Sequence, residues 1–357
     1  FFVVNFLNRT NMADFIRVYL VSFFALSLLG VVQYITPQIG LPPLLVEQWW
    51  VPQVLPRVNA FTYEPSFFAT YLLFGIPAML ILLARGNFAG IPKWLYYTML
   101  VVDVTALMLC SSRMGIFLFL VFLAGFIVYV MVRSIRERKL GLHLAMSFAA
   151  PLFVTASVLL IMDMRARQVN KDVGSAVYLL GAGWKEKDIT KGNSFKTRIQ
   201  SMKKTFDVFQ KNPVIGVSLG GIAPWIATTR LTDITSNDQV KSFEGINVPL
   251  EVLAASGVIG FAVFCIYIFQ LCRPLLKKWP AGGDKDYYIA LFWGFALGFI
   301  MLVENQNILR PYVWAHIALM VGVIHVLGRQ SPQEKKGIAM AYNIRQLFGT
   351  RRLAELF

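Results

Sequence analysis

Residues 66–84 read SFFATYLLFGIPAMLILLA, and residues 114–132 read MGIFLFLVFLAGFIVYVMV. Neither segment contains a charged side chain, and each is 19 residues long. A helix needs about 20 mostly apolar residues to cross the hydrocarbon core of a bilayer. Each segment is therefore long and apolar enough to form one membrane-spanning helix.

The same pattern recurs along the chain and predicts an all-α polytopic membrane protein. Hydrophobic residues make up 57% of the 357 residues and charged residues 15%, whereas soluble domains carry about 25% charged residues. A β-barrel would show short alternating segments instead of long apolar runs. We expect at least eight transmembrane helices, and residues 1–7 are apolar enough for the end of a ninth. The eight segments are 15–35, 66–84, 91–111, 114–132, 142–163, 248–272, 287–303 and 311–328.

Positive charge is divided unequally between the two sets of short segments that connect these spans. One set, which includes both chain ends, holds 18 lysines and arginines, whereas the short loops opposite hold only Arg57, Arg113 and Arg310. Because cytoplasmic loops carry an excess of Lys and Arg, we expect both ends of the chain in the cytoplasm. In a bacterial inner membrane the three arginines would then face the periplasm.

Two longer segments lie on this outer side and divide the chain into its predicted parts. Residues 36–63 form a Pro-rich loop within a transmembrane part, 1–164. Residues 165–247 form an 83-residue loop with a net charge of +6, and transmembrane helices in 248–328 and a basic tail, 329–357, follow it. Long translocated loops are exempt from the positive-inside rule, so this charge indicates an anionic ligand.

The large loop contains an amphipathic helix at residues 194–211. Its apolar residues recur at intervals of four and three, which places them on one helical face. They are Phe195, Ile199, Met202, Phe206 and Phe209. The opposite face carries Arg198 and three lysines. Either the helix simply docks by its apolar face, or Arg198 also points into a site.

Two outer segments near the first spans combine arginine with other polar groups. Arg57 and Glu64 precede a span that starts at Pro65, and Glu64 lies at the positive end of that helix dipole. The pair is either a helix cap beside an interfacial arginine or an anion-binding arginine positioned by Glu64. Arg113 lies in a very short turn, from which it reaches either lipid headgroups or a polar cavity.

A third segment surrounds the start of the span at 248–272. Glu244 and Asn247 precede that span, and Glu251 falls inside it. Intramembrane ionisable groups are expensive and mark functional sites by default. The alternative is that Glu251 is a structural partner for an arginine.

The fourth segment is the outer turn before the last span. It contains Asn305, Asn307 and Arg310, and His316 follows within the span. His316 is either a core histidine with a satisfied hydrogen bond or a proton acceptor.

Taken in this order, the motifs resemble the O-antigen polymerase and O-antigen ligase superfamily, which are Wzy-type bacterial polysaccharide polymerases and their ligase relatives. The resemblance covers residues 55–325. It rests on Arg57 to Glu64-Pro65 and Tyr71-Leu72, on Ser112-Arg113-Met114-Gly115, on Arg198 with Asn212-Pro213, Gly216 and Gly220, and on Asn247 with Leu250-Glu251, Gly257 and Gly260. Relatives often carry a histidine directly before that asparagine. Ile246 stands there in this chain, so no histidine base is carried over.

The resemblance implies a GT-C-like fold and an inverting glycosyltransferase. It would polymerise polyprenyl-diphosphate-linked oligosaccharide repeat units into O-antigen, capsule or exopolysaccharide at the periplasmic face. The implied residues are Arg57, Arg198, Arg113, Arg230 and Arg310 for the substrate diphosphate, Glu64, Glu244 or His316 for catalysis, and Asn247, Glu251, Asn305 and Asn307 for polar support. We predict no cofactor and no metal, because arginines can stabilise the departing phosphates.

The expected partners are the lipid-linked oligosaccharide, membrane lipids, a chain-length regulator and other export-pathway proteins, with no nucleic acid. Three other functions stay open. An O-antigen ligase would transfer the glycan to a glycolipid such as lipid A core. A transporter or flippase of anionic lipids would more often show internal repeats and interrupted helices. A structural scaffold would not explain why arginines and carboxylates gather on four outer segments. The Glu64-Pro65-Ser66 triplet and Ile246 favour the polymerase.

Overall fold

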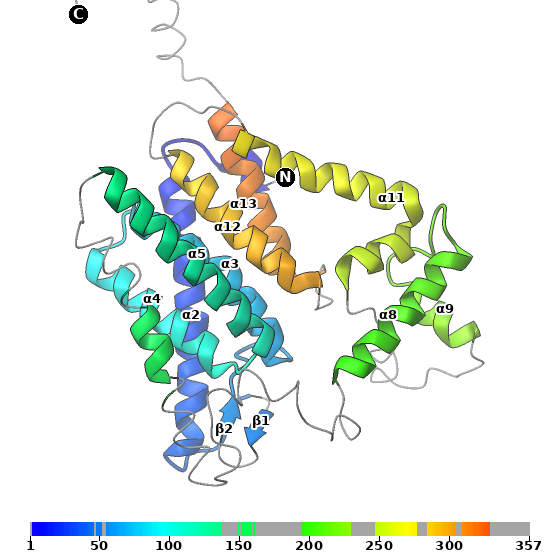
Figure 1. Cartoon of the computed structure of the whole chain (residues 1–357), viewed down its shortest axis with the longest axis horizontal. Helices are drawn as coiled ribbons and strands as arrows, with labels where there is room; N and C mark the ends of the chain where they lie inside the picture. The colour runs from blue at the N-terminus through cyan, green and yellow to red at the C-terminus, as the bar shows by residue number, and fades with distance from the viewer. Residues whose placement is uncertain are drawn as a thin grey trace, which may run out of the picture.

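The computed structural model in Figure 1 describes residues 2–45, 48–51, 55–137, 149, 151–158, 160, 194–229, 247–276, 284–303 and 309–328. In the first half of the chain its elements are α1 (Phe2–Phe6), α2 (Met12–Gln38), β1 (Gln48–Val51), β2 (Leu55–Arg57), α3 (Pro65–Ala84), α4 (Lys93–Leu109) and α5 (Arg113–Glu137). In the second half they are α8 (Ser194–Lys211), α9 (Ile222–Thr229), α11 (Val248–Cys272), a 3-10 turn (Arg273–Leu276), α12 (Asp284–Val303) and α13 (Pro311–Gly328).

Six of the described helices are long and apolar enough to cross a membrane, namely α2, α3, α5, α11, α12 and α13. They agree with the predicted class of all-α polytopic membrane protein. The prediction of eight spans goes further than this. Helix α4 fills the segment at 91–111 but has only 17 residues, and most of the segment at 142–163 lies outside the described residues.

Helix α3 is the centre of the bundle, because every side chain from Phe67 to Ala84 is buried. Glycines let its neighbours approach closely. A Cβ atom at Gly75 of α3 would come 2.5 Å from the ring of Phe23 on α2, and one at Gly298 of α12 would come 2.5 Å from the ring of Phe74. Small residues at such crossings allow backbones to pack tightly within a membrane.

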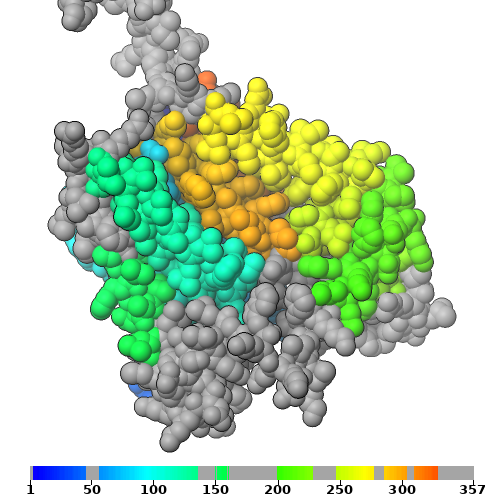
Figure 2. Space-filling model, in the orientation of Figure 1, coloured from blue at the N-terminus to red at the C-terminus, as the bar shows by residue number. Residues whose placement is uncertain are grey.

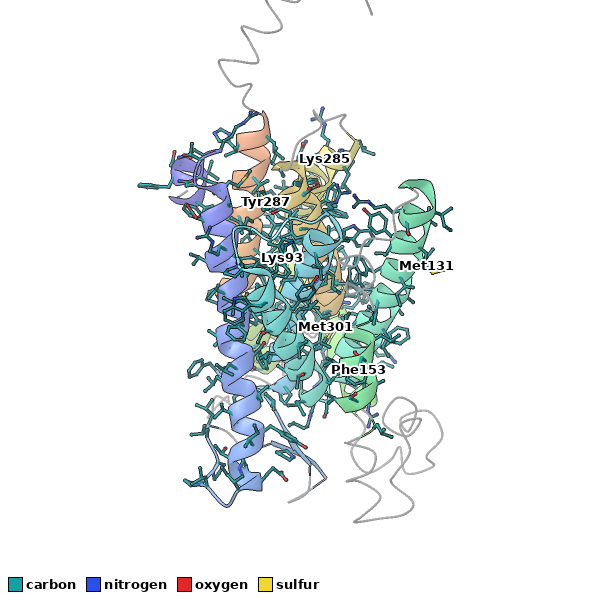
Figure 3. All side chains as sticks on the ribbon, turned by 90° about the vertical axis from the view of Figure 1, so that its left-hand side faces the viewer. Lys93, Met131, Phe153, Lys285, Tyr287 and Met301 are labelled. Atoms are coloured by element: carbon teal, nitrogen blue, oxygen red, sulfur yellow. The ribbon has the colours of Figure 1, made fainter. Side chains whose placement is uncertain are left out.

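Charged side chains form contacts between the helices at the end of the bundle where α3 and α5 end. Arg85 Nη1, just after α3, forms an ion pair with Asp286 Oδ1 of α12 at 2.5 Å. Arg133 Nη1 of α5 donates a hydrogen bond to the Ala84 carbonyl at 3.0 Å. Figure 3 shows Lys285 at this same end, the one predicted to be cytoplasmic.

The Pro-rich outer loop contains a two-stranded antiparallel sheet that the sequence did not predict. Gln48 of β1 lies opposite Arg57 of β2, with an irregularity between Trp49 and Val51. Pro56 is tolerated here because each strand of a two-stranded sheet has a free edge, where a missing N–H is not needed.

Helices α8 and α9 and the start of α11 form a second lobe beside the bundle, shown in green and yellow in Figures 1 and 2. The predicted bounds of α8 are confirmed, whereas the docking of its apolar face on the membrane surface or on the spans stays a prediction. Ser201, Thr205 and Val208 are the residues that pack inward, whereas Ile199 and Phe206 are 37% and 44% exposed. Small side chains face α9 and α11 because they let the three helices approach closely.

Helix α11 is not the continuous span that the sequence predicted, because it is broken at Gly257 (φ 62°, ψ −169°). The loop after α8 fills the break. Val217 N and Ser218 N donate to the carbonyls of Ala254 and Ala255 at 3.1 and 2.7 Å, and Val258 N donates to the Pro213 carbonyl at 2.9 Å. Three backbone hydrogen bonds thus replace helical bonds that the break removes. We call residues 213–218 the latch loop.

Candidate functional site

Three of the four chain segments that carry predicted site residues meet at the end of the bundle where α3, α5 and α13 begin. The Arg57 guanidinium donates from Nε to the Cys110 carbonyl at 3.3 Å and from Nη2 to the Ser111 carbonyl at 3.4 Å. The guanidinium carbon of Arg310 lies 4.6 Å from the centre of the Phe67 ring. We call Arg57, Glu64, Arg113 and Arg310 the arginine cluster.

Glu64 begins helix α3 as the sequence predicted. The backbone of Glu64 is extended (φ −126°, ψ 145°), and Pro65 takes the first helical position. The Glu64 carbonyl accepts hydrogen bonds from Phe67 N and Phe68 N. Its side chain is half-buried and accepts a hydrogen bond from Ser66 Oγ at 3.1 Å rather than capping the helix backbone. One carboxylate oxygen, Oε2, is therefore oriented by the neighbouring serine.

A tight turn places Arg113 at the first position of α5. Ser111 has a positive φ of 50°, and Ser112 Oγ accepts a hydrogen bond from Gly115 N at 3.4 Å. Both serines are buried, whereas the Arg113 side chain is exposed. A cation at a helix N-terminus opposes the helix dipole, so this position is better suited to holding an external anion than to stabilising α5.

The arginine cluster is strongly electropositive for two reasons that add. Helices α3, α5 and α13 all start here, and each N-terminus carries about half a positive charge. Three arginines add full charges against the single carboxylate of Glu64. Burial lowers the pKa of the half-buried Arg57 guanidinium, and the charge of Arg113 lowers it further, while Cys110 and Glu64 oppose this shift. An anion bound here would therefore relieve a desolvated positive charge.

His316 lies apart from this cluster as a fully buried core histidine. Its Nε2 faces the Leu291 carbonyl at 2.9 Å, which can only accept, so Nε2 carries the proton and Nδ1 accepts from Tyr19 Oη at 2.5 Å. The ring also packs against Phe74. Both nitrogens are thus engaged inside the bundle, as the core-histidine alternative expects, and a catalytic role of His316 stays a prediction.

Asn247 and Glu251 lie in the second lobe, at the start of α11. The Asn247 side chain caps that helix by accepting a hydrogen bond from Leu250 N at 2.9 Å. Glu251 is in the first turn and half-exposed. The structure therefore gives Asn247 a helix-capping role and places Glu251 at the positive end of the helix, where a carboxylate is favourable.

The remaining predicted residues are only partly placed. Arg198 lies in the second turn of α8, which stands apart from the bundle in Figure 1, but its side chain is outside the described part of the chain. Outside it altogether lie Arg230, Glu244, Asn305 and Asn307.

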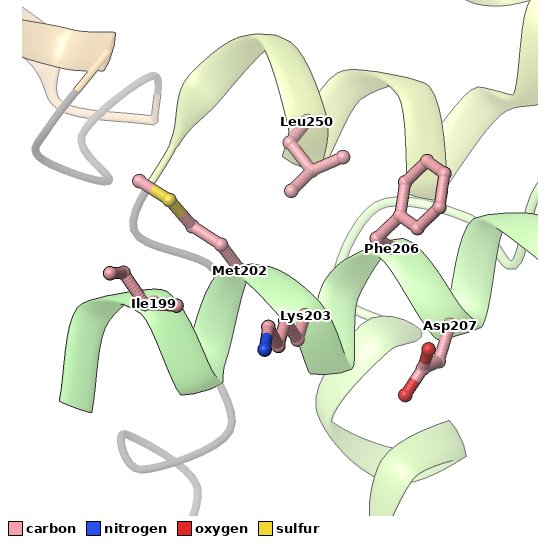
Figure 4. A pocket seen from close by; sticks show the side chains of 6 residues that line it. All are labelled: Ile199, Met202, Lys203, Phe206, Asp207 and Leu250. Atoms are coloured by element: carbon pink, nitrogen blue, oxygen red, sulfur yellow. The ribbon is translucent and has the colours of Figure 1, made fainter. Parts of the chain in front are cut away.

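A shallow open groove of about 410 Å³ runs between α8 and the start of α11. Figure 4 shows Met202 and Phe206 of α8 reaching toward Leu250 of α11, and Lys203 and Asp207 of α8 also line the groove. The groove uses part of the apolar face by which the sequence predicted α8 to dock. It is separate from the arginine cluster.

Two polar residues next to the cluster were missed by the sequence analysis. Gln33 of α2 and Asn59 are 6% and 0% exposed, and their side chains share a hydrogen bond of 2.6 Å. The available signal was a single glutamine inside an otherwise apolar span. Among the described residues, no group of three or more His, Cys, Asp or Glu side chains comes together to hold a metal ion.

The fold and this cluster define a polytopic membrane protein with a cationic site at one end of its bundle. Residues 98–265 match the family model described as O-antigen ligase. The match supports the O-antigen ligase and polymerase superfamily and so confirms the predicted recognition, and with it a membrane glycosyltransferase type of function. It contains Arg113, α8 and most of α11, whereas Arg57, Glu64 and Arg310 lie outside it. No curated protein and no solved structure matched the chain.

Proposed function

We propose that the chain is a glycosyltransferase that polymerises oligosaccharide repeat units carried on a polyprenyl diphosphate. The observation that supports this most is the arginine cluster, where three arginines and one carboxylate lie at the end of the bundle at which three helices begin. A diphosphate is the kind of ligand that such a site favours, because a guanidinium group stays charged and forms two parallel hydrogen bonds to the oxygens of a phosphate.

The reaction needs little more than positioned charge. The acceptor hydroxyl oxygen attacks the anomeric carbon of the donor glycan, the bond from that carbon to the diphosphate oxygen breaks, and its electron pair leaves with the lipid diphosphate. Arg57, Arg113 and Arg310 stabilise that developing charge, which is usually a large catalytic contribution. The acceptor proton passes to a carboxylate, for which Glu64 is the proposed base among the described residues.

The periplasmic location of the site and the inverting outcome are part of this proposal. Arg198, Arg230 and Glu244 belong to the large loop and would approach the same glycan from above. The bacterial inner membrane, with both chain ends in the cytoplasm, completes the proposed arrangement.

A second candidate is the O-antigen ligase itself, because the matching family model carries that description. The two enzymes share the donor and differ only in the acceptor. In a ligase the acceptor would be a glycolipid such as lipid A core, and in a polymerase a second lipid-linked repeat unit.

A transfer assay tests the proposal. Purified protein in liposomes receives an undecaprenyl-diphosphate-linked repeat unit with EDTA and no nucleotide, alone or with lipid A core. We expect a ladder of lengthened glycans that falls about 10²–10³-fold with Arg57→Ala and persists with Arg17→Gln, a control cation beside Ala89 at the opposite end.

The other outcomes each exclude something. Transfer only to lipid A core would replace the polymerase by the ligase. No product with either acceptor would overturn both and leave the anionic-lipid flippase, which the break in α11 would then favour.

A further inference from the structure

We infer that Gln33 is a positioning residue for the arginine cluster, and this inference rests on the proposed function. Gln33 lies in the last two turns of α2, and its amide is buried against the loop that carries Arg57. Its Oε1 accepts hydrogen bonds from Asn59 N at 3.1 Å and Ala60 N at 3.0 Å, and its Nε2 donates to Asn59 Oδ1 at 2.6 Å. One side chain thus holds two backbone groups and one side chain of the loop.

The backbone held by Gln33 is one that would not adopt its shape unaided. Ala60 has a φ of 45°, in the left-handed region that residues with a Cβ rarely occupy. One turn before Gln33, a Cβ at Gly30 would lie 2.7 Å from Val58 and 3.0 Å from Phe68. Helix α2 therefore approaches the loop closely enough for the amide to replace water around the two N–H groups.

Asn59 links this contact to two charged residues of the cluster, Arg57 and Glu64. On one side Val58, the residue between Arg57 and Asn59, donates a hydrogen bond from its N–H to the Leu109 carbonyl at 3.2 Å. On the other side the Asn59 carbonyl accepts from Thr62 N at 2.9 Å. Thr62 Oγ1 lies 2.7 Å from the Asn59 carbonyl and 2.8 Å from the Glu64 carbonyl, so its single proton is shared between the two. The distance between Arg57 and Glu64 is consequently fixed from the middle of the loop.

No other common side chain of this size makes the same set of bonds. Methionine has the length of glutamine but neither accepts from the two backbone N–H groups nor donates to Asn59. Glutamate keeps both acceptor contacts but, when ionised, buries a charge and brings a second acceptor oxygen against Asn59 Oδ1, and only its protonated form can donate there. This order, glutamine above glutamate above methionine, is what a positioning role predicts. Thr36→Val is a matched control, because Thr36 is buried one turn later on α2 and bonds only locally, to the Gln33 carbonyl.

The first test measures Arg57 itself. Protein in nanodiscs is treated with p-hydroxyphenylglyoxal with and without undecaprenyl diphosphate, and modification of Arg57 is followed by peptide mass spectrometry. We expect the lipid to protect Arg57 from modification in the wild type and in Thr36→Val. In Gln33→Met the affinity for the lipid should fall about 10- to 100-fold, and the affinity of Gln33→Glu should lie between those of the wild type and Gln33→Met. Equal protection in wild type and Gln33→Met would overturn the positioning role.

Two further measurements separate this inference from a purely structural effect and from the proposed function. Thermal unfolding of Gln33→Met shows whether the variant is folded at the assay temperature. Combining Gln33→Met with Arg57→Ala should add no further loss of glycan transfer, because the amide acts through Arg57. Additive losses would mean that Gln33 supports only the fold. Absence of lipid protection in the wild type would instead refute the diphosphate site, and with it the proposed function.

Discussion

Replacing Gly257 by alanine tests whether the broken helix and its latch loop form one unit. At φ 62° and ψ −169° only glycine is comfortable, and an added Cβ would collide with the backbone of Val214 and Ile215. The strain alone amounts to about 1–3 kcal/mol. If α11 straightens to relieve it, three latch hydrogen bonds are lost at about 0.5–1.5 kcal/mol each. Because those bonds are lost on opening in the wild type too, only the strain changes the balance, and the lobe should open more easily by about 1–3 kcal/mol.

Hydrogen–deuterium exchange in nanodiscs reads this change directly at the amides of Val217, Ser218 and Val258. Since 1.4 kcal/mol is a factor of ten, we expect these amides to exchange about 5- to 150-fold faster in Gly257→Ala. Gly125→Ala is the control, because Gly125 is helical within α5 and nothing lies within 4 Å of its Cβ position. Unchanged exchange at all three amides would refute the argument that glycine keeps the break open.

Other predictions follow from side chains around the bundle. Phe67→Leu should weaken lipid-diphosphate binding about 2- to 5-fold in a titration, because the ring holds Arg310 by a cation–π contact of about 0.5–1 kcal/mol, and Phe67→Tyr should preserve it. His316→Gln should lower thermal stability by about 1–3 kcal/mol and leave the pH profile of transfer unchanged; a shifted profile would support His316 as a base. Asp286→Asn should cost about 1–2 kcal/mol of stability, because the partly exposed ion pair with Arg85 is lost, without changing transfer; reduced transfer in the folded variant would contradict this.

Local patterns predicted several elements of this protein well. The uncharged run at 66–84 matches α3 to within one residue, and the glutamate-proline pair correctly marks where that helix begins. The intervals of four and three at 194–211 gave the bounds of α8. These features depend on residues close together in the chain, for which length, periodicity and helix-start chemistry are sufficient.

The same patterns misjudged what depends on distant neighbours. The intervals of the apolar residues in α8 did not indicate that Ser201, Thr205 and Val208 are the residues buried in the second lobe. The run at 248–272 was expected to be continuous, yet Gly257 breaks it because the latch loop, some 40 residues earlier, supplies the replacement hydrogen bonds. Periodicity cannot reveal a partner that another part of the chain provides.

The sequence by itself determined that this is an α-helical membrane protein whose lysines and arginines are divided unequally between two sets of connecting segments. Both the spans and the charge bias are properties of local composition. It also contained the motifs of the superfamily. Only the tertiary structure decided which of those residues share a site. It brought Arg57, Glu64, Arg113 and Arg310 to one end of the bundle, buried His316 in the core, and placed the Gln33 amide against the loop that carries Arg57. The physical reason is that helix packing, rather than sequence order, sets which side chains meet and which are sealed from water.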